Sequence, residues 1–144
     1  GGGPDESRLK HKAEALHADC EFHFYTRSEL SALLHGADLY VHTALIEIEA
    51  ISCMEAIACG LVPVICNSKR SATRFFAIDE NNLFEEKNAA ALAEKIDFWY
   101  KNESLKREYV DKYAEMRKSF SQSACMEEME KMLLNTIDGR KQAK

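Results

Sequence analysis

Short apolar runs alternate with segments of helical periodicity along most of this chain. Residues 39–42 and 62–66 are apolar and of strand length, and between them Ile51, Met54 and Ile57 recur at helical spacing. Strands that alternate with helices form parallel sheets, and continuously apolar strands are buried on both faces. The alternation therefore predicts an α/β fold built on a doubly wound parallel sheet.

Two further strands and several helices complete this pattern. We expect short strands at residues 21–25 and 83–84. Helical segments are expected from Asp5 or Ser7 to residue 16, from Ser28 to Gly36, through Ile51 to Gly60, at 72–76 as a short turn, and at 88–102, 105–120 and 123–137. Residues 138–144 are polar and are expected to fray. Sheets of this kind bind ligands beyond the carboxyl ends of their strands, which directs attention to the loops after Tyr25, His42 and Cys66.

Composition excludes several classes of protein. The 144 residues include 24 acidic and 19 basic side chains, a net charge of -5, and an acidic chain without a basic cluster is a poor nucleic-acid binder. No apolar run is long enough to span a membrane, and the Gly-rich, charged N-terminus is not expected to be a signal peptide. The five cysteines form no Cys-x-x-Cys pair. They predict small buried thiols, neither disulfides nor a metal site, in a reducing, cytoplasmic compartment.

The segment between Glu47 and Glu55 carries the most chemical information. It lies where a parallel strand gives way to a helix, whose unpaired N–H groups and dipole favour an anion such as a diphosphate. Carboxylates beside such an anion are useful when they accept hydrogen bonds from sugar hydroxyls. A coherent nucleotide-sugar site would place Glu47 on the sugar, the helix N-terminus on the diphosphate and Glu55 on the ribose.

The alternative is that these glutamates are solvated. Charged side chains usually lie on solvated faces, and for three scattered glutamates alone this is the better interpretation. Glu55, however, stands among Cys53, Met54, Ala56, Ile57 and Ala58. A lone carboxylate in so apolar a helix needs a partner or a ligand, which favours a binding site.

The same segment resembles a known signature. Glu47, seven residues and Glu55 are followed by Ala56-Ile57-Ala58-Cys59-Gly60-Leu61-Val62-Pro63-Val64. This order is similar to the signature of family 4 retaining glycosyltransferases, which have the two-domain GT-B fold. The resemblance extends over most of residues 1–119. Residues 52–57, 71–74 and 76–80 are similar to bacterial enzymes that glucosylate cholesterol or diacylglycerol.

The resemblance implies a fold and an activity. The chain would be one Rossmann-like half of a GT-B enzyme, with a nucleotide-sugar-binding domain at residues 1–120 and a C-terminal helix and tail at 121–144. The intact enzyme would transfer a hexose from UDP-glucose or a similar nucleotide sugar to a lipid or glycan acceptor, with retention of configuration. The donor is a substrate, and neither a metal nor another cofactor is expected. The alternative is a non-catalytic α/β module that binds a nucleotide or a partner protein.

The family's donor-site residues transfer to this chain position by position. By this resemblance, Glu47 takes the catalytic position and contacts the hydroxyls of the donor sugar, and Glu55 holds the ribose. The backbone N–H groups that would face the sugar and the diphosphate belong to Ala50, Ile51 and Ser52.

Other transferred positions depart from the family pattern. The loop at Tyr25 and Thr26 would lie near the nucleobase, although His23 replaces the usual glycine of that loop. The family often has Phe-Gly two residues after the first glutamate, where this chain has Glu49 and Ala50. Glu49 therefore adds a charge beside the donor.

The resemblance also implies partners. The family's Arg and Lys diphosphate clamp, on a loop after a first strand, has no counterpart before Gly1, so we expect an N-terminally truncated chain that is inactive by itself. Lys69, Arg70 and Arg74 either offset the clamp or form a solvated loop. The expected partners are the nucleotide sugar and the missing N-terminal acceptor domain. That domain would make any peripheral contact of the cytoplasmic enzyme with the inner membrane face, and no nucleic acid is expected.

Three further features receive structural interpretations. His42, at the end of a strand, is expected to have a structural role, and Trp99 and Tyr100 are expected to lie in the core. The last helix has an apolar stripe, which would be exposed in the isolated chain, formed by Cys125, Met129, Met132 and Leu133.

Overall fold

The computed structural model describes residues 2–142, with side chains described up to residue 138. The chain divides into two compact units, Gly1–Gly36 and Ala37–Lys144. This division reflects packing within each unit, so the domain boundary expected near residue 120 stays a prediction.

The first unit contains two helices, α1 (Glu6–Ala15) and α2 (Arg27–His35). Thr26 caps α2, because its hydroxyl oxygen accepts from the Glu29 N–H at 3.4 Å and the Glu29 carboxylate accepts from the Thr26 N–H at 2.8 Å. The start expected at Ser28 is therefore wrong. A threonine followed three residues later by a glutamate satisfies two open donors at once, which a cap at Ser28 would not.

Residues 18–26 have no regular secondary structure, so the strand expected at 21–25 is absent. A strand is stable beside hydrogen-bonded neighbours, and the first unit contains no other strand over residues 2–36. Asp5 precedes α1 as expected, but its carboxylate pairs with Arg8 at 3.0 Å and makes no capping bond. Leu9 of α1 and Leu16, which follows α1, are exposed.

A three-stranded parallel sheet forms the centre of the second unit. Its strands are, in spatial order, β1 (Tyr40–His42), β2 (Pro63–Cys66) and β3 (Leu83–Phe84). They match the strands expected from the sequence to within one residue. Because all three run in the same direction, their carboxyl ends lie at one edge of the sheet, where the loops after His42 and Cys66 begin.

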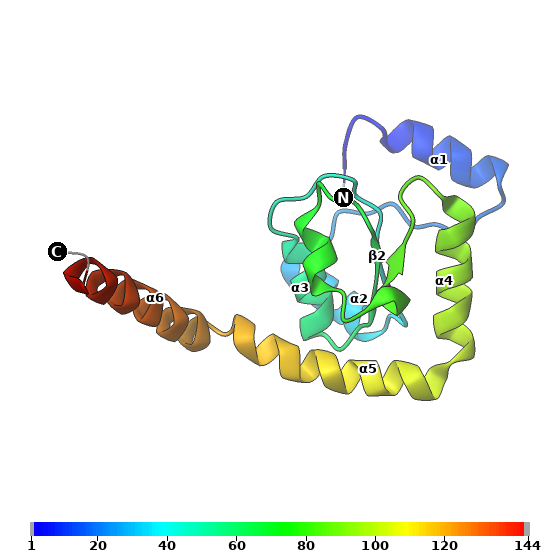
Figure 1. Ribbon diagram of the computed structural model, residues 1–144. Coiled ribbons are helices and arrows are strands. Elements are labelled where there is room, and N and C mark those ends of the chain that lie inside the picture. The colour runs from blue at the N-terminus through cyan, green and yellow to red at the C-terminus, as the bar shows by residue number, and fades with distance from the viewer. Residues whose placement is uncertain (1, 143–144) are drawn as a thin grey trace. The chain divides into compact units, whose positions relative to one another are not determined.

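Helices flank this sheet. Figure 1 shows α3 (Ile51–Ala58) and α4 (Ala89–Lys101) on either side of β2, and both contact the strands. The other helical segments are α5 (Glu103–Met116), α6 (Gln122–Gln142) and the short 3₁₀ helices η1 (Ala72–Phe76), η2 (Glu80–Asn82) and η3 (Arg117–Phe120). Helix α6 continues through residues 138–142, and the fraying expected from residue 138 stays a prediction. The last two residues of that segment lie outside the described residues.

Trp99 is the largest fully buried side chain. Its ring packs edge-on against Tyr109 with centroids 4.8 Å apart, and its indole N–H donates to the Asn81 carbonyl at 3.1 Å. Tyr109 in turn donates to the Asp79 carboxylate. These contacts join η2 to α4 and α5. The core interpretation is confirmed for Trp99, whereas Tyr100 is exposed.

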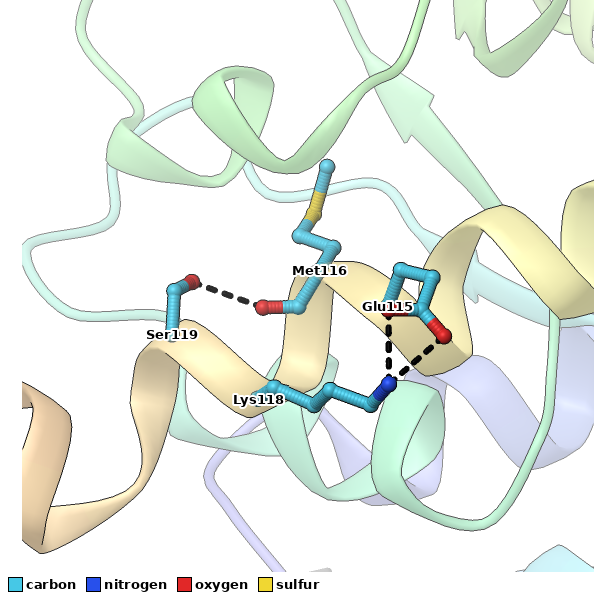
Figure 2. Close-up of polar contacts among 4 residues, drawn as sticks. All are labelled: Glu115, Met116, Lys118 and Ser119. Carbon is cyan, nitrogen blue, oxygen red and sulfur yellow. Dashed lines mark hydrogen bonds and ion pairs between the residues drawn. The ribbon is translucent and has the colours of Figure 1, made fainter.

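The end of α5 is joined to the end of α3. Figure 2 shows the contacts at the end of α5, which are made by Glu115, Met116, Lys118 and Ser119. The Ser119 hydroxyl donates to the Met116 carbonyl at 2.7 Å, which satisfies an acceptor that the helix end leaves open. Beside this contact, Arg117 donates to the Ala58 carbonyl at 3.1 Å. The last turn of α3 is thereby held to η3.

Within residues 2–142, no helix combines the length and the apolar character needed to cross a bilayer. The apolar stripe expected on the last helix is exposed along α6, as the sequence predicts, at Cys125, Met129, Met132 and Leu133.

Gly60 follows α3 in the left-handed conformation, with a φ of 89°, as expected of a glycine just past a helix. A Cβ at this position would meet no atom within 4 Å, so the cost of Gly60→Ala comes from the backbone alone. We expect this substitution to lower the free energy of unfolding by roughly 1–2 kcal/mol, measured by urea denaturation. Gly60→Asn is the control, because asparagine adopts this conformation more readily. Equal losses in the two variants would argue against a backbone origin.

Candidate functional site

Two loops meet at the carboxyl edge of the sheet, one after β1 and one after β2. The Glu47 N–H donates to the Arg70 carbonyl at 3.4 Å, and the Glu47 carbonyl accepts from the Ala72 N–H at 2.9 Å. The Ser68 hydroxyl donates to the Leu45 carbonyl at 2.8 Å. These hydrogen bonds fix Glu47 in the loop ahead of α3, where the sequence places it.

Ala50 begins α3 in the left-handed region, with a φ of 54° and a ψ of 41°. Glycine adopts this conformation freely, whereas a residue with a Cβ loses roughly 1–2 kcal/mol. The Ala50 carbonyl accepts from the N–H groups of Cys53 and Met54 at 2.9 and 3.2 Å, and its side chain is buried. The first turn of α3 thus holds Ala50 in a backbone conformation that favours glycine.

The Glu47 carboxylate turns back onto the turn that precedes α3. Its Oε1 accepts from the Ile48 N–H at 2.9 Å. This hydrogen bond, followed by the contribution of the Ala50 N–H, lowers the pKa of Glu47 below its ordinary value, so the side chain is ionised at neutral pH. The N–H groups of Ile51 and Ser52 have no hydrogen-bond partner among the described residues. They are the donors left open for an anion.

An open hollow of about 480 Å³ lies over this turn, lined by residues 47–52. Its volume is within the range of small-molecule sites. Glu47 is half-buried, whereas Glu49, Ile51 and Ser52 are exposed. The structure therefore brings together the predicted site residues of this segment, which are Glu47, Glu49, Ala50, Ile51 and Ser52.

Glu55 lies about one turn along α3 and is half-buried, next in sequence to the buried Ala56. Its carboxylate has no hydrogen bond or ion pair to any described residue. Burial raises the pKa of Tyr40, and the charges of Glu47 and Glu55 raise it further. The Glu55 carboxylate therefore remains available to a ligand.

A chain of hydrogen-bonded side chains connects α3 to η1 through β1. The Tyr40 hydroxyl lies 2.8 Å from Ser52 Oγ and 3.0 Å from His42 Nδ1. His42 Nε2 lies 3.0 Å from Thr73 Oγ1, which accepts from the Ser71 hydroxyl at 3.1 Å. His42, Ser71 and Thr73 are buried. We call these five side chains the polar relay.

Most of the polar relay has no signal in the sequence. Tyr40 and His42 are two residues apart on a strand, so they share a face, and this spacing was the one available indication. The structural role expected of His42 accords with its burial. Thr73, however, lies 31 residues further along the chain, and no local pattern indicates that it returns to β1.

Tyr25 and Thr26 belong to the first unit. The Tyr25 hydroxyl donates to the Glu21 carboxylate at 3.1 Å, and Thr26 caps α2. Both side chains are thus engaged within their own unit, and their place near a nucleobase stays a prediction.

The exposure of the cations that follow β2 favours the interpretation of a solvated loop. Lys69 and Arg70 are exposed and Arg74 is half-buried. Over the part of the chain that the structure describes, no three or more His, Cys, Asp or Glu side chains converge in a way that could hold a metal ion.

His42 gives the stability of the fold a pH dependence. Burial lowers the pKa of His42 below its ordinary value of 6.5, against a smaller opposing effect of the Glu47 charge. The folded state therefore favours the neutral ring, whose contribution is complete above about pH 6.5 and is lost as the pH falls through the lower, folded pKa. We expect the free energy of unfolding to fall from about pH 7 to 5. His42→Gln should flatten this part of the curve, measured by urea denaturation at each pH, and an unchanged slope would assign the effect to other groups.

Known proteins share this sequence pattern and this fold. Residues 1–117 match the family described as Glycosyl transferases group 1. The crystal structure of the catalytic domain of cholesterol-alpha-glucosyltransferase from Helicobacter pylori is similar over 84% of this chain and 76% of that chain, with 45% sequence identity and a TM-score of 0.80. No curated protein matches the chain. The predicted α/β fold and the resemblance carried by residues 47–64 are confirmed, and the chain belongs to the group 1 glycosyltransferases, enzymes of the GT-B fold.

Proposed function

We propose that the hollow at residues 47–52 binds the sugar and diphosphate of a nucleotide-sugar donor such as UDP-glucose. The enzyme transfers the hexose to a lipid or glycan acceptor with retention of configuration. The observation that carries this proposal is the pair of unpartnered N–H groups of Ile51 and Ser52 at the start of α3. Anion donors with carboxylates close by suit a ligand that combines a diphosphate with sugar hydroxyls.

The start of α3 serves the diphosphate. Its two open N–H groups and the helix dipole supply positive potential at the place where the leaving diphosphate gains charge. Because these groups are fixed by the fold before the donor arrives, they need no reorganisation during the reaction. The proposal includes no metal ion and no organic cofactor.

Glu47 serves the donor sugar. Its carboxylate is ionised and held by the Ile48 N–H, and its remaining lone pairs can accept hydrogen bonds from sugar hydroxyls. In this catalytic position Glu47 orients the sugar over the diphosphate. Glu49 is exposed at the rim of the hollow, where solvent and salt screen its charge.

Glu55 serves the ribose. Its carboxylate has no partner among the described residues, and two adjacent ribose hydroxyls can donate hydrogen bonds to it. The role of Tyr25 and Thr26 at the nucleobase stays what the family resemblance implies.

The name of the Helicobacter pylori protein states that it makes an α-glucoside of cholesterol. Glucose is α-linked in UDP-glucose, so transfer from that donor to form an α-glucoside would retain configuration. Cholesterol and diacylglycerol are the first acceptors to test for the present chain. We propose that a further domain holds the acceptor and that the intact enzyme is cytoplasmic, in peripheral contact with the inner membrane face.

Calorimetric titration with UDP and UDP-glucose tests the donor site. We expect Glu55→Ala to weaken binding about tenfold, or about 1.4 kcal/mol, through the loss of a charge-assisted hydrogen bond. Glu94→Ala is the matched control, because Glu94 is an exposed glutamate on helix α4 without a partner. Its affinity should equal that of the unchanged protein.

Two outcomes would contradict this proposal. Folded protein that fails to bind either nucleotide at millimolar concentration has no donor site. Binding without glucose transfer to any lipid or glycan acceptor, with the acceptor domain present, would favour a non-catalytic nucleotide-binding module.

A further inference from the structure

The buried end of the polar relay fixes where its protons lie. The Ser71 hydroxyl donates to Thr73 Oγ1 at 3.1 Å. Thr73 is fully buried, and among the described residues the one acceptor available to its own proton is His42 Nε2, at 3.0 Å. A buried hydroxyl without an acceptor is costly, so Thr73 donates to His42.

This donation sets the tautomer of His42. The ring is neutral, because burial disfavours its charged form. A neutral imidazole that accepts at Nε2 carries its proton on Nδ1. The Nδ1–H then donates to the Tyr40 oxygen at 3.0 Å, and the Tyr40 hydroxyl donates to Ser52 Oγ at 2.8 Å. The Ser52 hydroxyl then accepts from Tyr40, and its own O–H has no acceptor within the polar relay.

The opposite direction satisfies fewer groups. Ser52 would donate to Tyr40, Tyr40 to His42 Nδ1, and His42 Nε2 to Thr73. Thr73 would then accept from both His42 and Ser71, and its own proton would have no acceptor among the described residues. Burial of the Thr73 end therefore selects the direction that runs towards Ser52.

The Ser52 hydroxyl lies at the hollow, where its unused hydrogen could be donated to an anion. It is exposed, it lines the hollow, and its own N–H and that of Ile51 are open to an anion. We propose that Tyr40, His42 and Thr73 are positioning residues that present the Ser52 hydroxyl as a hydrogen-bond donor to the diphosphate of the sugar donor. This inference rests on the proposed function. The hydroxyl becomes a third donor beside the two N–H groups, and it turns no lone pair towards the anion.

A double-mutant cycle on UDP affinity tests the inference. Ser52→Ala removes the hydroxyl and is expected to weaken UDP binding roughly tenfold. Tyr40→Phe and Thr73→Val keep the side-chain shape, remove one hydroxyl each, and are expected to weaken binding about threefold through Ser52. In the Ser52→Ala background, neither should weaken binding further, and Thr73→Ser should bind as the unchanged protein does. A purely structural effect would instead weaken binding with or without the Ser52 hydroxyl.

The tautomer of His42 provides a readout that does not depend on ligand. Nitrogen-15 NMR of the ring nitrogens, assigned with His42→Gln, should show a protonated Nδ1 and a bare Nε2 at neutral pH. Thr73→Val should abolish this preference. A protonated Nε2 in the unchanged protein would overturn the inference, because Ser52 would then donate to Tyr40.

The two proposals fail in different ways. If UDP binds and Tyr40→Phe and Thr73→Val bind it equally well, the positioning role is wrong and the donor site stands. If the unchanged protein does not bind UDP, the donor site is wrong and the positioning role falls with it.

Discussion

The backbone hydrogen bonds between Glu47 and residues 70–72 hold the start of α3, and the rest of the site depends on them. They join the loop after β1 to the loop after β2 at the carboxyl edge of the sheet. With its N–H and carbonyl both engaged, Glu47 leaves only its carboxylate to face the turn. The left-handed residue Ala50 then begins the helix so that the N–H groups of Ile51 and Ser52 open into the hollow.

This arrangement is costly in stability, and the rest of the second unit offsets the cost. Ala50 carries a Cβ in a conformation that favours glycine, and the relay buries a histidine and two hydroxyls. Against these stand the apolar core around Trp99, a hydrogen-bond partner for every buried polar side-chain atom described, and the Arg117 contact at the end of α3. Strain concentrated where two loops meet is typical of functional sites.

The sequence predicted the elements that local chemistry determines. Continuous apolar runs located β1 and β2, and Gly60 marked the end of α3, because left-handed turns depend on single residue types. The strand at 21–25 was wrong, since its formation requires a neighbouring strand that no local pattern reveals. The role of Glu55 in binding the ribose was inferred from its apolar sequence neighbours and from the family resemblance, and it stays a prediction.

The polar relay could not be predicted from the sequence, because it joins segments that are far apart along the chain. Its members come from β1, α3 and the segment around η1, and they meet only because the sheet edge brings those segments together. Serine, threonine and tyrosine are so common that no spacing identifies them as partners. The roles of Tyr25 and Thr26, by contrast, were transferred from a family pattern, and they stay predictions.

The most direct test of the central claim is an NMR titration of the backbone amides with UDP-glucose. A donor site at the start of α3 predicts the largest shift changes at the N–H groups of Ile51 and Ser52. Changes concentrated at Phe84 and Leu92, which line a second hollow of about 300 Å³, would place the nucleotide elsewhere and contradict the claim.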